Sequence, residues 1–145
     1  LNALSTWNTK QLEKIEGAFS YIRPLIDISG VSKWNTSRVD SFKELFNYTS
    51  ITTTNDLSSW KTSNVTNMKE TFSHTKIKDL KGLSKWDTSK VETFERTFDH
   101  LDASDVSGIN KWDLSSGTNF DNMFYKAKRT PKWEGTFTEE GTYVK

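Results

Sequence analysis

The amino-acid sequence predicts an α/β repeat protein, a curved solenoid of about five strand–helix repeats that ends in a β-hairpin cap. The first observation is a tryptophan that recurs at spacings of 27, 26, 26 and 26 residues, at Trp7, Trp34, Trp60, Trp86 and Trp112. The second is that other residues keep a constant distance from this tryptophan. The third is a strand-like alternation of side chains near the C-terminus, in residues 130–145. Self-similarity at a period of about 20–50 residues is typical of stacked repeats.

Apolar side chains recur in four columns around the tryptophan, which predicts that they form the core. Aliphatic residues lie three positions before it, at Leu4, Val31, Leu57, Leu83 and Ile109. They also lie five positions after it, at Leu12, Val39, Val65 and Val91, with Gly117 as the exception. Large apolar residues lie eight positions after it, at Ile15, Phe42, Met68, Phe94 and Phe120. Phenylalanines lie twelve positions after it, at Phe19, Phe46, Phe72, Phe98 and Phe124.

The columns after the tryptophan predict a helix in each repeat. Offsets of five, eight and twelve residues form an i, i+3, i+7 pattern, which is one face of an α-helix. Ser37 and Ser89 precede Asp40 and Glu92 by three residues, the spacing of a capping box at a helix N-terminus. We therefore expect a short helix of about three turns per repeat, for example near residues 63–73.

The segment before the tryptophan predicts a short strand or extended segment. Gly30, Gly82 and Gly108 lie four residues before their tryptophans, where the chain can turn tightly. One strand and one helix per repeat of about 20–29 residues is the leucine-rich-repeat plan. Strands stack about 4.8 Å apart and helices about 8–10 Å apart, so we expect a curved stack with the strands on its inner side.

The two ends of the chain predict a boundary near residue 129. Residues 1–129 hold the five repeats, and Trp133 follows the last repeat tryptophan after only 21 residues, outside the register. Residues 130–145 alternate like strands around Glu139-Glu140-Gly141 and predict a hairpin that caps the core or starts another module. The chain opens at Leu1 without an initiator methionine, which indicates a piece of a longer protein.

Composition excludes several classes of function. A net charge of +1 argues against nucleic-acid binding. The absence of cysteine excludes disulfides, thiolate metal sites and cysteine nucleophiles. No apolar stretch is long enough for membrane insertion. Without a GxSxG elbow, an HExxH motif or a phosphate loop, the sequence indicates no catalytic residues, no enzyme activity and no cofactor.

The Trp-centred motif resembles a known repeat. Residues 57–72 read LSSWKTSNVTNMKETF and residues 83–91 read LSKWDTSKV, similar to the unit of the BspA-like surface-protein repeats. The resemblance covers roughly residues 4–129. It implies a leucine-rich-repeat-like fold and an extracellular place on the cell surface, in surface proteins and lipoproteins of mycoplasmas and Gram-positive bacteria. It also implies an adhesive or host-interacting role, without a ligand or binding residues.

Basic residues predict one candidate binding surface. Lys33, Lys85 and Lys111 directly precede their tryptophans, and Arg38 and Lys90 lie four residues after theirs. If these columns face solvent together, they form a basic stripe that attracts an acidic partner. The alternative is a solvated face without a partner.

A second candidate is the column fourteen residues after each tryptophan. It holds Tyr21, Tyr48, His74 and His100 and predicts a contact stripe. The alternatives are a helix C-terminal position, where histidine suits the helix dipole, and a two-histidine metal site; the sequence assigns no metal. Asp99, Asp102 and Asp105 lack the spacing of a calcium loop and are expected to be solvated.

The sequence therefore predicts a non-catalytic adhesion domain of a longer, anchored surface protein. It is expected to bind a macromolecule of a host or a neighbouring cell, first of all an extracellular protein. A glycan is the alternative ligand if the tryptophan faces are exposed, whereas tryptophans that pack in the core would exclude that platform. The alternative function is a structural spacer or docking module of a larger surface protein or surface enzyme.

Overall fold

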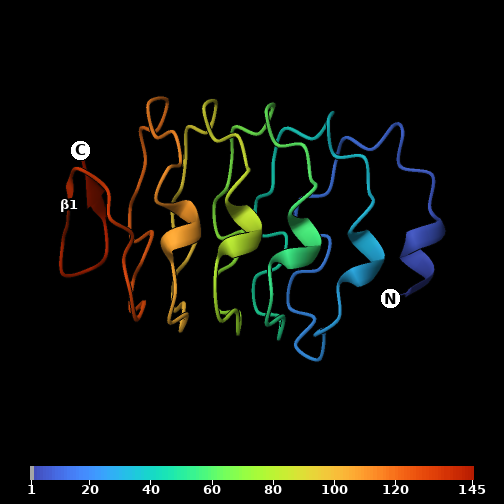
Figure 1. The fold of residues 1–145 in the computed structure, drawn as a ribbon, viewed down its shortest axis with the longest axis horizontal. Coiled ribbons are helices and arrows are strands. Elements are labelled where there is room, and N and C mark those ends of the chain that lie inside the picture. Colours follow the sequence, from blue (N-terminus) through green and yellow to red (C-terminus); the bar gives the residue numbers. More distant parts are fainter. Residues whose placement is uncertain (1) are drawn as a thin grey trace.

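The predicted repeats form a linear stack in the computed structural model, which describes residues 2–145 (Figure 1). The N-terminus lies at one end of the stack and the C-terminal hairpin at the other. One short 3-10 helix per repeat lies in a row along the stack: η1 Asn2–Thr6, η2 Ser29–Val31, η3 Asn55–Leu57, η4 Lys81–Leu83 and η5 Ser107–Ile109. Within residues 2–145, the strands are β1 Thr136–Phe137 and β2 Tyr143–Val144. The repeating unit is confirmed, but its secondary structure differs from the prediction.

The predicted helices are absent from residues 2–145, and the helix expected near residues 63–73 was wrong. This segment makes consecutive turns, with Glu70 and His74 both at a φ of 55° in the left-handed region. The N–H groups of residues 68, 70, 72 and 74 donate to carbonyls of the next repeat, at N–O distances of 2.9–3.0 Å. An α-helix would direct these N–H groups along its own axis. Hydrogen bonding between repeats therefore replaces the bonds of a helix.

The predicted strand before each tryptophan was also wrong, because the part nearest the tryptophan forms the 3-10 helix. Upstream of η4 the chain is extended, and Asp79 makes an isolated parallel bridge with Asp105 of the next repeat. In the fourth repeat, the Asp79 carboxylate accepts the N–H of Lys81 at 3.0 Å and starts η4. A Cβ atom on Gly82 would lie 2.0 Å from the Thr54 carbonyl oxygen, so glycine here permits close approach of two repeats. The expected curvature depended on α-helices packing farther apart than strands, and that reason no longer applies.

The expected capping boxes are replaced by local turns. The Ser89 N–H donates to the Asp87 carboxylate at 3.0 Å, and the Ser37 N–H donates to the Asn35 side chain at 3.1 Å. Asparagine and aspartate stabilise such turns because their side-chain oxygens reach the N–H two residues later. These serines therefore shape the bend after the tryptophan and cap no helix.

Aromatic rings stack from repeat to repeat through the core. Phe46, Phe72 and Phe98 stack with centroid separations of 6.0 and 5.8 Å. The tryptophans of repeats two to five are buried, as a core position requires, and the Trp86 Nε1–H donates to the Leu57 carbonyl at 3.0 Å. Trp7 is 60% exposed, because no described repeat lies on its outer side.

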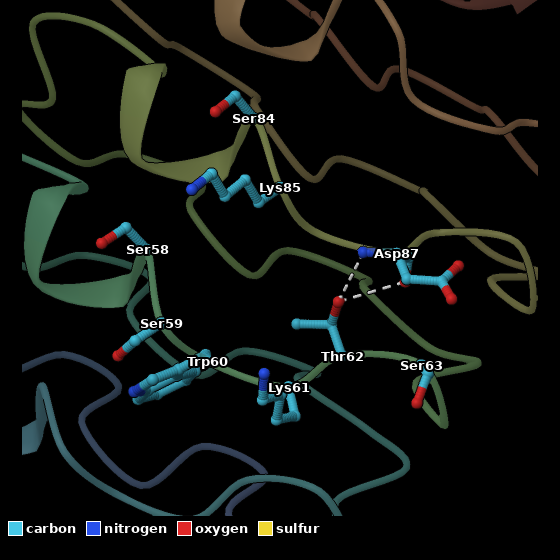
Figure 2. Close-up of a pocket in the computed structure, with 9 residues that line it drawn as sticks. All are labelled: Ser58, Ser59, Trp60, Lys61, Thr62, Ser63, Ser84, Lys85 and Asp87. Atoms are coloured by element: carbon cyan, nitrogen blue, oxygen red, sulfur yellow. Dashed lines mark hydrogen bonds between the residues drawn. The ribbon is translucent and has the colours of Figure 1, made fainter.

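Buried threonines connect the repeats by polar contacts. The Thr62 hydroxyl donates to the Asp87 carbonyl at 3.1 Å and accepts the Asp87 N–H at 2.8 Å (Figure 2). Thr36 and Thr88 donate in the same way to the repeats that follow them. Among the described residues, every buried side-chain nitrogen or oxygen has a hydrogen-bond partner. The stack thus combines an aromatic interior with satisfied polar groups.

The predicted C-terminal hairpin is present and covers the end of the core. Thr136 pairs with Val144 and Phe137 with Tyr143, and the turn ends at Gly141 with a φ of 73°. Trp133, outside the repeat spacing, makes the same kind of hydrogen bond as the repeat tryptophans, since its Nε1–H donates to the Ile109 carbonyl at 2.9 Å, and its ring meets Tyr143 of the hairpin edge-on at 5.1 Å. Helices within residues 2–145 are all too short to cross a membrane.

Candidate functional site

The lysines that precede the tryptophans are exposed. In repeats two to five the tryptophan enters the core three residues after the 3-10 helix ends, and the residue directly before it is exposed. Lys33, Lys85 and Lys111 form no ion pair with any residue in the range 2–145. The third repeat has Ser59 at this position, and its hydroxyl donates to the Ser32 carbonyl at 2.8 Å. The column therefore offers three unpaired cations with one polar interruption.

The other two predicted basic residues are engaged with their neighbours. Arg38 forms an ion pair with Glu13 at 2.8 Å and a hydrogen bond with Gln11. Lys90 donates to the Asn64 side chain at 3.5 Å. Arg38 and Lys90 therefore contact side chains of the preceding repeat, whereas the first three lysines remain free to meet a partner.

One of the free lysines borders a surface hollow of about 480 Å³ between the third and fourth repeats (Figure 2). Its lining consists of hydroxyl groups, two lysines, one carboxylate and the edge of a tryptophan: Ser58, Ser59, Trp60, Lys61, Thr62, Ser63, Ser84, Lys85 and Asp87. Hydrogen bonds from Ser89 hold the pKa of the Asp87 carboxyl below its usual value. The hollow is thus lined by two lysines and one ionised carboxylate, which points away from the lysine side chains (Figure 2).

The predicted contact stripe is a stack of rings. The ring centroids of Tyr21 and Tyr48 are 4.5 Å apart, those of Tyr48 and His74 are 4.3 Å apart, and those of His74 and His100 are 4.0 Å apart. All four residues have positive φ angles. They lie at turns, so the helix C-terminal position considered for the histidines was wrong.

Cations accompany this ring stack. The Arg23 guanidinium lies 5.3 Å from the Tyr48 centroid. Beyond His100, Tyr125 meets the imidazole edge-on at 5.6 Å and contacts the Arg96 guanidinium at the same 5.6 Å separation. The rings stack on one another, so the stripe presents mainly ring edges and flanking positive charges.

Asp99 is buried, which corrects the prediction that it is solvated. Its carboxylate is only 6% exposed and lies 2.6 Å from His100 Nδ1, 3.2 Å from the Arg96 guanidinium and 3.7 Å from His74 Nε2. Asp102 is exposed, in agreement with the prediction. Asp105 accepts the Ser107 N–H at 2.9 Å and the Ser107 hydroxyl at 2.6 Å, and both bonds lower the pKa of its carboxyl.

The stack changes the protonation of one histidine. Burial lowers the pKa of His74 below 6.5, and the positive charge that His100 can carry lowers it further, while Asp99 acts in the opposite direction. Burial disfavours a charged imidazole because it removes the water that solvates the charge. His74 is therefore neutral at pH 7 and has a free nitrogen lone pair.

Two overlapping segments of the chain, residues 1–81 and 48–134, match the DUF285 family, described as Mycoplasma protein of unknown function. Together they cover most of the chain. The chain belongs to the DUF285 family. No curated protein and no solved structure matches it. The two DUF285 matches agree with an array of similar units, as the tryptophan period predicted.

Two features of this DUF285 array were missed by sequence reasoning. The hollow depends on Lys61 and Asp87, which follow their tryptophans directly, in a column that varies between asparagine, lysine and aspartate. The buried carboxylate depends on Asp99, whose column otherwise holds Ser20, Asn47, Ser73 and Tyr125. Neither column has a constant chemical character, so comparing repeats gives no signal for either feature.

Proposed function

We propose that this chain is a non-catalytic interaction domain, exposed at the cell surface, that binds a protein of a host or a neighbouring cell. The observation that supports this most directly is the column of free cations on the second, fourth and fifth repeats of the stack, Lys33, Lys85 and Lys111. Charges held in register on a solenoid suit a large partner better than a small substrate. Complementary charge increases the association rate and selects the partner.

The resemblance to BspA-like repeats supports the finer part of this proposal. Membership of a Mycoplasma repeat family is compatible with a leucine-rich-repeat-like surface protein, and the quoted motifs favour that narrower assignment and the extracellular location. The tryptophans of repeats two to five are core residues, so their faces do not offer a platform for a glycan. A protein with an acidic surface is therefore the favoured ligand.

The test is a binding screen with a charge-reversed variant. Biolayer interferometry of the 145-residue chain against extracellular matrix proteins, immunoglobulins and glycans should give a saturable response with a protein. Replacing Lys33, Lys85 and Lys111 by glutamate should slow association and reduce its salt dependence. The circular dichroism spectrum should stay unchanged.

The matched control reverses three other exposed lysines, Lys76, Lys78 and Lys128. This control changes the net charge by the same amount but leaves the lysine column intact. It should therefore bind more tightly than the first variant. Equal losses in both variants would indicate an effect of net charge and contradict the lysine column. A blank screen with folded protein would favour the second function.

The second candidate function is a spacer or docking module of a larger surface protein or surface enzyme. Exposed apolar side chains in the first repeat favour it, since Trp7, Tyr21, Ile22 and Ile26 all lie there. Such residues are typical of a surface that another part of a protein covers. Reduced accessibility of Trp7 to acrylamide quenching in a longer chain would support docking.

A further inference from the structure

Two histidines and a carboxylate converge at the boundary between the third and fourth repeats. His74 belongs to the third repeat, and Asp99 and His100 belong to the fourth. One potential ligand atom from each residue lies within 4.8 Å of the other two. These are the two histidines of the chain, so the repeat register brings every imidazole of the protein to one place.

We propose that His74, Asp99 and His100 form a binding site for one divalent transition-metal ion of the zinc type. Imidazole nitrogens and a carboxylate oxygen are ordinary ligands for zinc, and three protein ligands with one water complete a tetrahedral site. Metal–ligand bonds of about 2.0–2.1 Å place neighbouring ligand atoms roughly 3.3–3.4 Å apart in a tetrahedron. The distance of 3.7 Å between His74 Nε2 and Asp99 Oδ2 is close to this spacing.

Binding of the ion requires side-chain movements. The Asp99 oxygen and His100 Nδ1, which are 2.6 Å apart, have to separate, and the two imidazoles have to tilt out of their stack so that both nitrogens face the ion. The side chains of His74 and His100 are 28% and 37% exposed. This exposure leaves room for the tilt, for entry of an ion and for a metal-bound water.

The neighbours of Asp99 support this role. The Ser73 hydroxyl donates to the carboxylate at 3.3 Å and orients it, as an outer-shell partner of a metal ligand does. The Arg96 guanidinium also contacts Asp99, and it competes with a bound cation. Arg96 lies 5.6 Å from the Tyr125 ring centroid as well, so it keeps a favourable contact when the carboxylate turns to the ion.

The rest of the ring column predicts the stoichiometry. The equivalent positions in other repeats are Tyr21, Tyr48 and Lys126, which do not supply an imidazole. We therefore expect one ion per chain. The column also provides a matched substitution: tyrosine stacks on its neighbour at Tyr21 and Tyr48, so His74→Tyr and His100→Tyr remove a ligand while retaining a ring.

The first experiment uses the unaltered protein, purified without an affinity tag. Because the chain has only two histidines, the imidazole C–H signals in a proton NMR spectrum report on the site directly. Titration with zinc chloride at pH 7 should shift or broaden both histidine signals and reach an end point at one equivalent. Magnesium chloride should leave both unchanged, because Mg²⁺ prefers oxygen ligands. Histidine signals that do not respond to zinc would overturn the proposal.

The second experiment measures zinc affinity by isothermal titration calorimetry. His74→Tyr, His100→Tyr and Asp99→Asn should each weaken binding at least about tenfold, with Asp102→Asn as the control that does not change affinity. Lowering the pH to 5.5 should weaken binding in the unaltered protein, because protons compete for the imidazoles. Equal affinity in both tyrosine variants and the unaltered protein would place the ion elsewhere and refute the site. If a variant fails to fold, the histidine titration decides alone.

Discussion

The tryptophan side chains fill space and donate a hydrogen bond across the repeat boundary. In the fourth repeat, Trp86 is 5% exposed, and its Nε1–H donates to the carbonyl of Leu57 at 3.0 Å. Its ring stacks on Trp60 and Trp112 with centroid separations of 6.5 and 6.4 Å. One residue thus holds together three repeats. Among the described residues, Trp7 of the first repeat stacks on one tryptophan, Trp34, with a centroid separation of 5.9 Å.

This difference predicts unequal effects of the same substitution. Trp86→Ala should lower the free energy of unfolding by about 3–5 kcal/mol, because it leaves a cavity in the core and removes the hydrogen bond between the third and fourth repeats. Trp7→Ala should cost less than about 1.5 kcal/mol, because the side chain is largely in water. Urea denaturation followed by circular dichroism measures both. Similar losses in the two variants would contradict the burial pattern.

The lowered pKa of His74 predicts a dependence of stability on pH. Burial lowers its pKa in the folded state below the unfolded value of 6.5, so the unfolded chain binds more protons as the pH falls through that value. Stability should therefore decrease on acidification below about pH 6.5. The titratable and charged groups around His74 are Tyr48, His100, Asp99, Arg23 and Arg96.

His74→Tyr tests this linkage, because tyrosine does not titrate in this range and retains the stack. The decrease in melting temperature between pH 7.5 and pH 5.5 should be smaller in this variant than in the unaltered protein, without added metal. If the melting temperature of the variant depended on pH as it does in the unaltered protein, His74 would not contribute to the loss of stability on acidification.

At the scale of the element, the short turns depend on close approach and on left-handed residues. A Cβ atom on Gly82 would lie 2.0 Å from the Thr54 carbonyl oxygen, which requires two backbones to separate. Gly17 has a φ of +64°, and a Cβ there would meet no atom closer than 4.0 Å. The same column holds Asn122 with a φ of 52°. These glycines therefore serve different purposes.

This contrast predicts that substitution of Gly82 destabilises the protein, whereas substitution of Gly17 is tolerated. Gly82→Ala should destabilise the protein by about 1–3 kcal/mol, as overpacking does. Gly17→Asn should be nearly neutral, because asparagine adopts the left-handed region more readily than most residues. Thermal unfolding of the two variants provides the comparison. If Gly82→Ala left the melting temperature unchanged, the repeats would be able to separate at this position without loss of stability.

At the scale of the whole molecule, each repeat is stabilised by its neighbours and the last by the hairpin. Phe124 donates its N–H to the Gly141 carbonyl at 3.0 Å, and Tyr143 meets the Phe120 ring edge-on at 5.2 Å. In a stack with nearest-neighbour contacts, loss of an end weakens the adjacent repeat most. The hairpin therefore protects the fifth repeat before all others.

Removing the contact between Tyr143 of the hairpin and the fifth repeat should destabilise mainly that repeat. Tyr143→Ala should accelerate amide hydrogen exchange in residues 117–127 more than in residues 39–74, measured by mass spectrometry. Val144→Ala is the matched control, because Val144 lies in the same strand with its side chain 49% exposed. A uniform acceleration along the chain would indicate one cooperative unit in place of a stack of coupled repeats.

The sequence alone predicts the period, the buried columns and the hairpin, because these depend on which residues recur and on their polarity. Phe46, Phe72 and Phe98 lie in the core as their register requires. The free lysines and the ring column also follow from register, since residues at equal offsets become neighbours in any stack. Their function as binding residues stays a prediction.

The tertiary structure decides how the backbone connects these columns. Val65, Met68 and Phe72 have helical spacing, yet left-handed residues such as Glu70 and His74 turn the chain so that the same side chains face inward. The bonds that favour this arrangement join residues about 25 positions apart, such as Met68 and Thr93, and local periodicity does not report on them. The burial of Asp99 beside His74 and His100 has the same cause. It arises from contacts between adjacent repeats, which exist only once the stack has formed.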